Sequence, residues 1–227
     1  MKEQRKGARR GGPQRDTAPA EGLRAARRDG QPAEAQHAAQ LERAVAAAVE
    51  VLRAGGLILY PTDTVWGIGC DATNSEAVAR IYRLKRSENK HAMLVLCHSA
   101  EQIVRYVNKA PGIAFEVMEM ATSPLTLILP GATGLAENLI PDEGTLGVRV
   151  PDHAFCQRLL RAFGRPIVST SANISGAETP RRFAEIDREV IDGVDHVVHP
   201  QVQGRPTGKP SSIIAFGEGG EVRVIRK

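Results

Sequence analysis

Short apolar runs recur along this chain, and segments with the spacing of amphipathic helices lie between them. The run LILY at residues 57–60 follows Gly55 and Gly56 and ends at Pro61, which predicts a buried strand. By the same reasoning, further strands are predicted at residues 92–97, 125–130, 145–151, 166–170, 196–199, 211–216 and 222–226. Because several of these strands follow one another with only loops between them, the pattern favours a mixed sheet over a regular βαβ alternation.

Helices are expected in most of the remaining segments. The first begins near Ala38, because Leu41, Val45, Val49 and Leu52 recur at helical spacing. A second follows Ser75, whose hydroxyl is expected to cap it. The others are predicted at residues 100–107, 111–121 and 152–163. Together with the strands, they predict an α/β fold with a twisted mixed sheet and flanking helices.

The first 37 residues differ in composition from the rest of the chain. They are rich in Arg, Gly, Pro, Gln and Ala, and after Met1 their only large apolar residue is Leu23. Such a segment buries too little apolar surface to repay its ordering entropy, so we expect a disordered basic tail at residues 1–37 and a folded domain at residues 38–227. Residues 1–40 carry nine Lys and Arg against five acids, and the rest of the chain is balanced. A neutral body argues against a protein that grips nucleic acid through a broad basic face.

The cysteines and the hydropathy of the chain indicate in which cellular compartment it is expected. The chain has three cysteines and no CxxC pair, so neither a disulfide scaffold nor a cysteine zinc site is expected, and a cytoplasmic location fits. No apolar run approaches the roughly 20 residues of a membrane span. The basic N-terminus lacks the apolar stretch of a secretory signal, so none is expected.

Two polar segments stand next to predicted elements. YPTDTVWGIGCDA at residues 60–72 offers Thr62 and Thr64 hydroxyls at a strand end, either for a small polar ligand or in a turn capped by Asp63. Residues 82–91 place Lys85, Arg86 and Lys90 near a helix end. There they either stabilise the helix dipole or clamp a triphosphate.

Two more polar segments lie on predicted strands. Arg149 stands inside the apolar strand at residues 145–151, where it needs a buried ion-pair partner or acts as an anion ligand. IVSTSANISG at residues 167–176 ends a strand with hydroxyl and amide side chains, which suit phosphate or ribose oxygens or a hydrogen-bonded loop. The chain contains no GxxxxGK[ST], GxGxxG or GxSxG motif, which argues against a P-loop, a dinucleotide fingerprint and a hydrolase elbow.

Taken together, these segments resemble the YrdC-type threonylcarbamoyl-adenylate synthase family over roughly Ala38 to Arg226. The matching motifs occur in the family's order: Pro61–Gly67, Lys85–Lys90, Pro124–Leu129, Thr145–His153, Ser169–Asn173 and Pro210–Ser212. The resemblance implies a sheet with helices that enclose one large basic cavity. It also implies an enzyme that joins L-threonine, bicarbonate or CO2 and ATP into threonylcarbamoyl-AMP, releasing pyrophosphate, for tRNA modification.

The resemblance also implies roles for individual residues. As catalytic residues it implies Lys85, Arg86, Ser171 and Asn173. As substrate contacts it implies Thr62, Arg149, Ser169 and Ser211. As nucleotide contacts it implies Lys85, Arg86, Lys90, Thr145, Ser171, Thr179 and Arg226. No protein metal site is implied, and Mg2+ is expected to arrive with ATP.

The chain departs from the family pattern at the basic cluster. The family usually shows Lys-x-Arg, whereas here Arg86 directly follows Lys85 and Ser87 stands in the arginine position. The chain resembles the single-domain form of the family, and tRNA-modification proteins and tRNA are its expected partners. The alternatives are a carbamoyl-adenylate-forming domain, a non-catalytic RNA-binding module and a sensor of ATP or threonine without turnover.

Overall fold

The computed structural model describes residues 31–87 and 93–227, with side chains from residue 35 onward. The chain divides into two units, residues 1–38 and residues 39–227. Helix α2 (Gln31–Arg53) begins earlier than the expected start near Ala38. The early start has a physical reason, because QPAEAQHAA is rich in helix formers and Pro32 is tolerated in a first turn. The remainder of the predicted tail, residues 1–30, lies outside the described residues.

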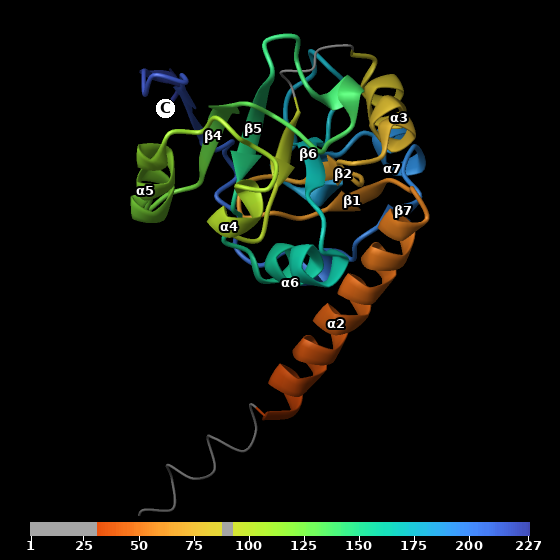
Figure 1. The fold of residues 1–227 in the computed structure, drawn as a ribbon. Coiled ribbons are helices and arrows are strands. Elements are labelled where there is room, and N and C mark those ends of the chain that lie inside the picture. The colour runs from red at the N-terminus through yellow and green to blue at the C-terminus, as the bar shows by residue number, and fades with distance from the viewer. Residues whose placement is uncertain (1–30, 88–92) are drawn as a thin grey trace, which may run out of the picture. The chain divides into compact units, whose positions relative to one another are not determined.

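The second unit is built on one mixed sheet. Its strands are β1 (Ile58–Tyr60), β2 (Gly67–Gly69), β3 (Leu94–Leu96), β4 (Leu125–Pro130), β5 (Thr145–Arg149), β6 (Ile167–Ser171), β7 (His196–Val197), β8 (Ser212–Phe216) and β9 (Val222–Arg226). The order across the sheet is β7-β1-β2-β6-β3-β5-β4-β8-β9. The pairs β1–β7, β3–β5 and β4–β8 are parallel and the other neighbours are antiparallel. The predicted mixed α/β fold is therefore confirmed (Figure 1).

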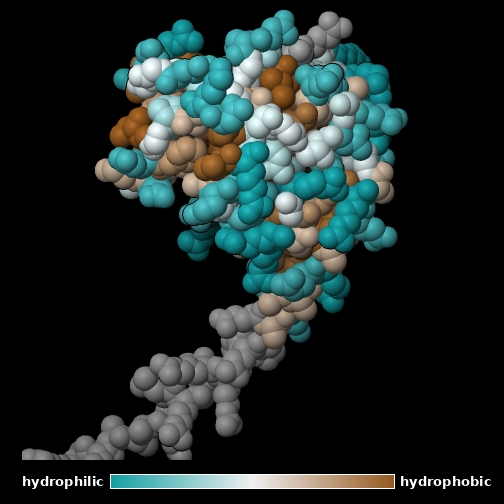
Figure 2. Space-filling model, in the orientation of Figure 1, coloured by the Kyte–Doolittle hydropathy of each residue, from teal (hydrophilic) through white to brown (hydrophobic). Residues whose placement is uncertain are grey.

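Helices lie against the sheet. After α2 they are α3 (Ser75–Lys85), α4 (Ala100–Ile103), α5 (Gly112–Met120), α6 (Ala154–Phe163) and α7 (Arg188–Asp192), with 3-10 turns η2 (Glu137–Leu139), η3 (Phe183–Glu185) and η4 (Pro200–Val202). No helix among the described residues is long and apolar enough to cross a membrane. The surface in Figure 2 is mostly hydrophilic, with its hydrophobic patches in the upper part of the view.

Two apolar cores lie on opposite faces of the sheet. Because side chains alternate along a strand, Leu59 of β1 packs into one core and Ile58 into the other. The first core includes buried residues of α3 and α7, and the second joins α2 to α6. Figure 1 shows α3 beside α7 and α6 beside the C-terminal part of α2. The free cysteines Cys70, Cys97 and Cys156 are all buried in these cores.

Strand β2 is the one strand among the described residues that the sequence did not predict, and the short helix α7 was also not predicted. Gly67, Ile68 and Gly69 lie in the segment expected to be a ligand loop, and they pair with β1 on one side and β6 on the other. Glycines are depleted in strands because they lack a side chain to pack, so the sequence pattern gave no strand signal. Here their missing side chains are required: a Cβ on Gly69 would lie 2.7 Å from the Val168 carbonyl oxygen.

The cap of α3 also differs from the prediction. Asn74, not Ser75, is the N-cap, and its side-chain oxygen accepts hydrogen bonds from the backbone N–H groups of Glu76 and Ala77 at 3.0 Å each. Asn74→Ala should therefore lower the free energy of unfolding by about 1 kcal/mol, measured by urea denaturation. Ser75→Ala is the matched control and should change it by less than about 0.5 kcal/mol. A larger loss for Ser75→Ala than for Asn74→Ala would contradict this cap assignment.

Candidate active site

A cavity of about 250 Å³ opens on one face of the sheet. Because alternate residues of a strand share a face, neighbouring strands present a continuous wall to it. From β4, β5, β6 and the start of β8, the lining takes Thr126, Ile128, Thr145, Gly147, Arg149, Ser169, Ser171, Ser211 and Ile213. The loop after β1 adds Thr62, Thr64 and Val65, and β2 adds Gly67.

The lining is rich in hydroxyl groups and carries positive charge. Its charged residues are Arg149 and Arg226, and the lining includes no carboxylate among the described residues. The described residues also contain no group of three or more His, Cys, Asp and Glu that could hold a metal ion. The two arginines and the hydroxyl groups make the cavity suitable for an anionic small molecule.

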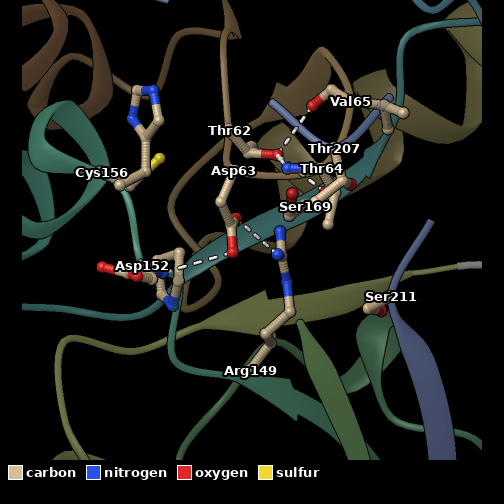
Figure 3. Close-up of polar contacts among 12 residues, drawn as sticks. Thr62, Asp63, Thr64, Val65, Arg149, Asp152, Cys156, Ser169, Thr207 and Ser211 are labelled. Atoms are coloured by element: carbon tan, nitrogen blue, oxygen red, sulfur yellow. Dashed lines mark hydrogen bonds and ion pairs between the residues drawn. The ribbon is translucent and has the colours of Figure 1, made fainter. Parts of the chain in front are cut away.

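Arg149 is both a buried ion-pair partner and part of the cavity wall. Its Nη1 donates to Asp63 Oδ1 at 2.6 Å, and the two side chains are only 4% and 10% exposed. Asp63 Oδ2 also accepts from the backbone N–H of Asp152 at 3.3 Å. Figure 3 shows Arg149 extending from β5 toward Asp63. The carboxylate compensates the buried charge and fixes the guanidinium, which has further N–H donors for an anion.

Thr62 shapes the loop between β1 and β2. Its Oγ1 donates to the Val65 carbonyl oxygen at 2.8 Å and accepts from the Thr64 N–H at 3.0 Å (Figure 3). Of the two alternatives for this segment, a turn capped by Asp63 is not observed: Thr62 makes the turn, and Asp63 pairs with Arg149. The correction has a simple cause, since an aspartate beside a buried arginine gains more from the ion pair than from a local turn.

Ser169 lines the cavity and is hydrogen-bonded to Tyr60. Tyr60 OH donates to Ser169 Oγ at 2.8 Å, and both residues are buried. Burial raises the pKa of Tyr60, so the phenol stays protonated and acts as the donor. Because a hydroxyl both accepts and donates, Ser169 can give its own proton to a ligand oxygen.

Lining residues on β4, β5 and β9 and at the start of β8 also make hydrogen bonds. Thr126 Oγ1 and Ser211 Oγ are 2.7 Å apart, and Arg226 Nε donates to the Ser211 carbonyl oxygen at 2.9 Å. Burial lowers the pKa of Arg226. Thr145 Oγ1 donates to Glu143 Oε1 at 3.2 Å at the start of β5. These contacts place the side chains of Ser211, Thr145 and Arg226 on the cavity wall.

Eight of the predicted site residues thus line one cavity: Thr62, Thr145, Arg149, Ser169, Ser171, Thr179, Ser211 and Arg226. Three others do not line it. Lys85 Nζ donates to the backbone carbonyl oxygens of Ser171 and Asn173. Arg86 Nη2 donates to both carboxylate oxygens of Glu189 at 2.7 and 2.9 Å. The Asn173 side-chain amide donates to the Ala177 carbonyl oxygen at 2.8 Å. Lys90 lies outside the described residues.

Comparison with known proteins assigns the chain to a family. The Sua5/YciO/YrdC family model, described as telomere recombination, matches residues 50–227. The chain belongs to this family. A Halorhodospira halophila protein named threonylcarbamoyl-AMP synthase is 36% identical over 159 residues, which cover 69% of this chain and 83% of that one.

Two solved structures of Sua5/YciO/YrdC proteins share the fold. That of E. coli YciO is 30% identical with a TM-score of 0.71, and the match covers 82% of this chain and 89% of YciO. That of P. abyssi Sua5 complexed with L-threonine is 26% identical with a TM-score of 0.69, and the match covers 76% of this chain. The chain spans 50% of that Sua5.

Sequence reasoning missed several residues that build the Sua5/YciO/YrdC site in this chain. Tyr60 and Thr126 were not singled out and Asp63 was considered only as a turn residue, although each contacts a predicted site residue. A signal for Thr126 was available, since a hydroxyl inside the apolar run LTLILP needs a polar partner. Trp66 also lines the cavity, and its Nε1 donates to Gln203 Oε1 at 3.1 Å, a contact 137 residues apart that no local pattern reveals.

Proposed function

We propose that this chain is an L-threonylcarbamoyladenylate synthase. It forms threonylcarbamoyl-AMP and pyrophosphate from L-threonine, bicarbonate or CO2, and ATP, and the product serves the N6-threonylcarbamoyl modification of adenosine in tRNA. The observation that carries the proposal is the buried Arg149 at the wall of a cavity whose described lining is rich in hydroxyl groups. The similarity to named threonylcarbamoyl-AMP synthases and to a Sua5 complexed with L-threonine supports it.

Arg149 is the proposed ligand of the threonine carboxylate. A guanidinium already fixed by Asp63 loses little further freedom when it binds, and the carboxylate satisfies donors that the ion pair leaves open. Ser169 would donate its proton to the same substrate, and Thr62 and Ser211 would bound its side chain. Holding the amine in one place contributes much of the rate acceleration.

The reaction needs no covalent enzyme intermediate. The threonine nitrogen forms a bond to the carbon of CO2 and loses a proton, which gives N-carboxythreonine. One oxygen of this new carboxylate then attacks the α-phosphorus of ATP. The bond between that phosphorus and the bridging oxygen breaks, and pyrophosphate leaves with the electron pair. Cations and fixed dipoles stabilise the charge that develops on the phosphates.

The nucleotide is proposed to lie along Thr145, Ser171, Thr179 and Arg226. These side chains line the same cavity as the threonine ligands, so both substrates can meet there. Mg2+ would accompany ATP and balance phosphate charge, with most of its ligands supplied by phosphate oxygens and water. Proteins of tRNA modification would take up the product. The basic side chains within residues 1–40 are the proposed contact with tRNA.

Pyrophosphate release tests this function. With the purified chain, Mg2+ and ATP, we expect release only when both L-threonine and bicarbonate are present. Omission of either, or EDTA in excess of Mg2+, should reduce release to background. Carbamoyl phosphate in place of both substrates tests the carbamoyl-adenylate alternative. Turnover with carbamoyl phosphate, or RNA binding without any turnover, would overturn the proposal.

A further inference from the structure

Lys85 occupies an unusual position for a predicted phosphate ligand. It is the last residue of α3 and only 4% exposed. Its Nζ donates to the carbonyl oxygens of Ser171 and Asn173 at 2.6 Å each. It does not line the cavity, although the Ser171 side chain does.

These contacts hold the segment that follows β6. The backbone of Lys85 takes part as well, because its carbonyl oxygen accepts from the Ser175 N–H at 2.9 Å. Asn173 closes the same turn through its amide, which donates to the carbonyl oxygens of Ile174 at 3.1 Å and Ala177 at 2.8 Å. One lysine therefore binds two alternate carbonyl oxygens of this segment, and Ser171 of the same segment lines the cavity.

The charge of Lys85 is balanced by backbone dipoles. No carboxylate of the described residues lies within ion-pair distance of its Nζ. Burial lowers the pKa of Lys85 to about 8, so most of the population stays protonated at neutral pH. An ammonium is a stronger donor than a neutral amine, and two short bonds to carbonyl oxygens make effective use of it.

We propose that Lys85 is a positioning residue, which fixes the backbone of Ser171–Asn173 so that the Ser171 hydroxyl meets the nucleotide. This role rests on the proposed function of the same cavity. The two carbonyl bonds take two of the three N–H donors of the ammonium, and the third lies on a buried side chain that does not line the cavity. The neighbouring Arg86 does not replace it, because its guanidinium is bound to Glu189 on the exposed side of α3 and α7.

Nucleotide binding separates the two roles of Lys85. Lys85→Met and wild type are titrated with AMP, ADP and ATP by calorimetry. If Lys85 positions the Ser171 segment, affinity should fall on the order of tenfold for all three nucleotides alike. If Lys85 contacts the β- and γ-phosphates, the loss should grow from AMP to ATP. That second result would overturn the proposal.

Two further variants control for charge and for the helix. Lys85→Gln keeps two N–H donors without the charge, so it should restore part of the lost affinity, whereas a direct phosphate contact predicts a loss equal to that of Lys85→Met. Arg83 lies on the exposed side of the same helix, so the variant Arg83→Met should bind the three nucleotides with wild-type affinity. Equal loss in Lys85→Gln and Lys85→Met would count against positioning.

Hydrogen exchange tests the inference without any nucleotide. In Lys85→Met, the amides of Ser175 and Ala177 should exchange about tenfold faster than in wild type, while those of β5 are unchanged. Unaltered exchange at Ser175 and Ala177 would overturn the positioning role. Wild-type protein that binds no nucleotide would refute the proposed function instead, and the exchange result would still decide the role of Lys85.

Discussion

Arg149→Ala should lower kcat/KM for L-threonine by about 10²–10³-fold, because it removes a fixed, largely desolvated ligand of the substrate carboxylate. Truncating one partner of a buried charge pair costs about 2–5 kcal/mol, and each 1.4 kcal/mol is about a factor of ten. The loss should appear mainly in the dependence on threonine, with the KM for ATP changed less. Initial rates of pyrophosphate release over a threonine concentration series measure it.

The same substitution leaves Asp63 buried without its partner, so its effect on stability must be separated from that on binding. We expect Arg149→Ala to lower the free energy of unfolding by about 3–5 kcal/mol. The double variant Asp63→Leu/Arg149→Met replaces the pair by apolar side chains and should recover most of that stability. It should still lack activity. A folded double variant that turns over at the wild-type rate would remove Arg149 from the site.

Gly69→Val should lower the free energy of unfolding by about 3 kcal/mol, since it overpacks the centre of the sheet. A Cβ at Gly69 would lie 2.7 Å from the Val168 carbonyl oxygen and 2.8 Å from the Tyr60 ring. Neither neighbour can move easily, because Val168 belongs to β6 and Tyr60 is fully buried. For a chain of this size the thermal midpoint should fall by roughly 5–10 °C.

Gly112→Ala is the matched control for this prediction. Gly112 begins α5, and a Cβ there meets nothing within 4 Å. Alanine should therefore be neutral or stabilise by up to about 1 kcal/mol. Thermal denaturation of both variants followed by circular dichroism makes the comparison. A Gly69→Val protein as stable as Gly112→Ala would show that β2 does not pack as described.

The sequence predicted most of the fold because its strongest signals are local. The run LTLILP became β4 at the residues expected, β5 and β8 lie within their predicted ranges, and β6 is shifted by one residue from its range. Strand β2 was missed because its hydrogen bonds come from β1 and β6, the latter about 100 residues away. The cap of α3 was misplaced by one residue, because Asn74 and Ser75 are both good caps and only backbone geometry distinguishes them.

The sequence predicted which side chains share the cavity better than it predicted their hydrogen-bond partners. The hydroxyls and Arg149 reach one cavity because strand alternation and strand order place them there. The direction of Lys85 could not be predicted, because its partners are the backbone carbonyls of Ser171 and Asn173, which carry no side-chain signature. The partner of Arg149 lies 86 residues away, and a mixed sheet brings the two together only after it has formed.

The most direct test of the central claim is the fate of the bicarbonate carbon. The chain is incubated with ATP, Mg2+, L-threonine and ¹³C-bicarbonate, and the nucleotides are analysed by mass spectrometry after rapid quenching. We expect threonylcarbamoyl-AMP that carries the label. This labelled product should be absent when threonine is omitted and strongly reduced in Arg149→Ala. An unlabelled adenylate, or no adenylate at all from the folded wild-type chain, would contradict the central claim.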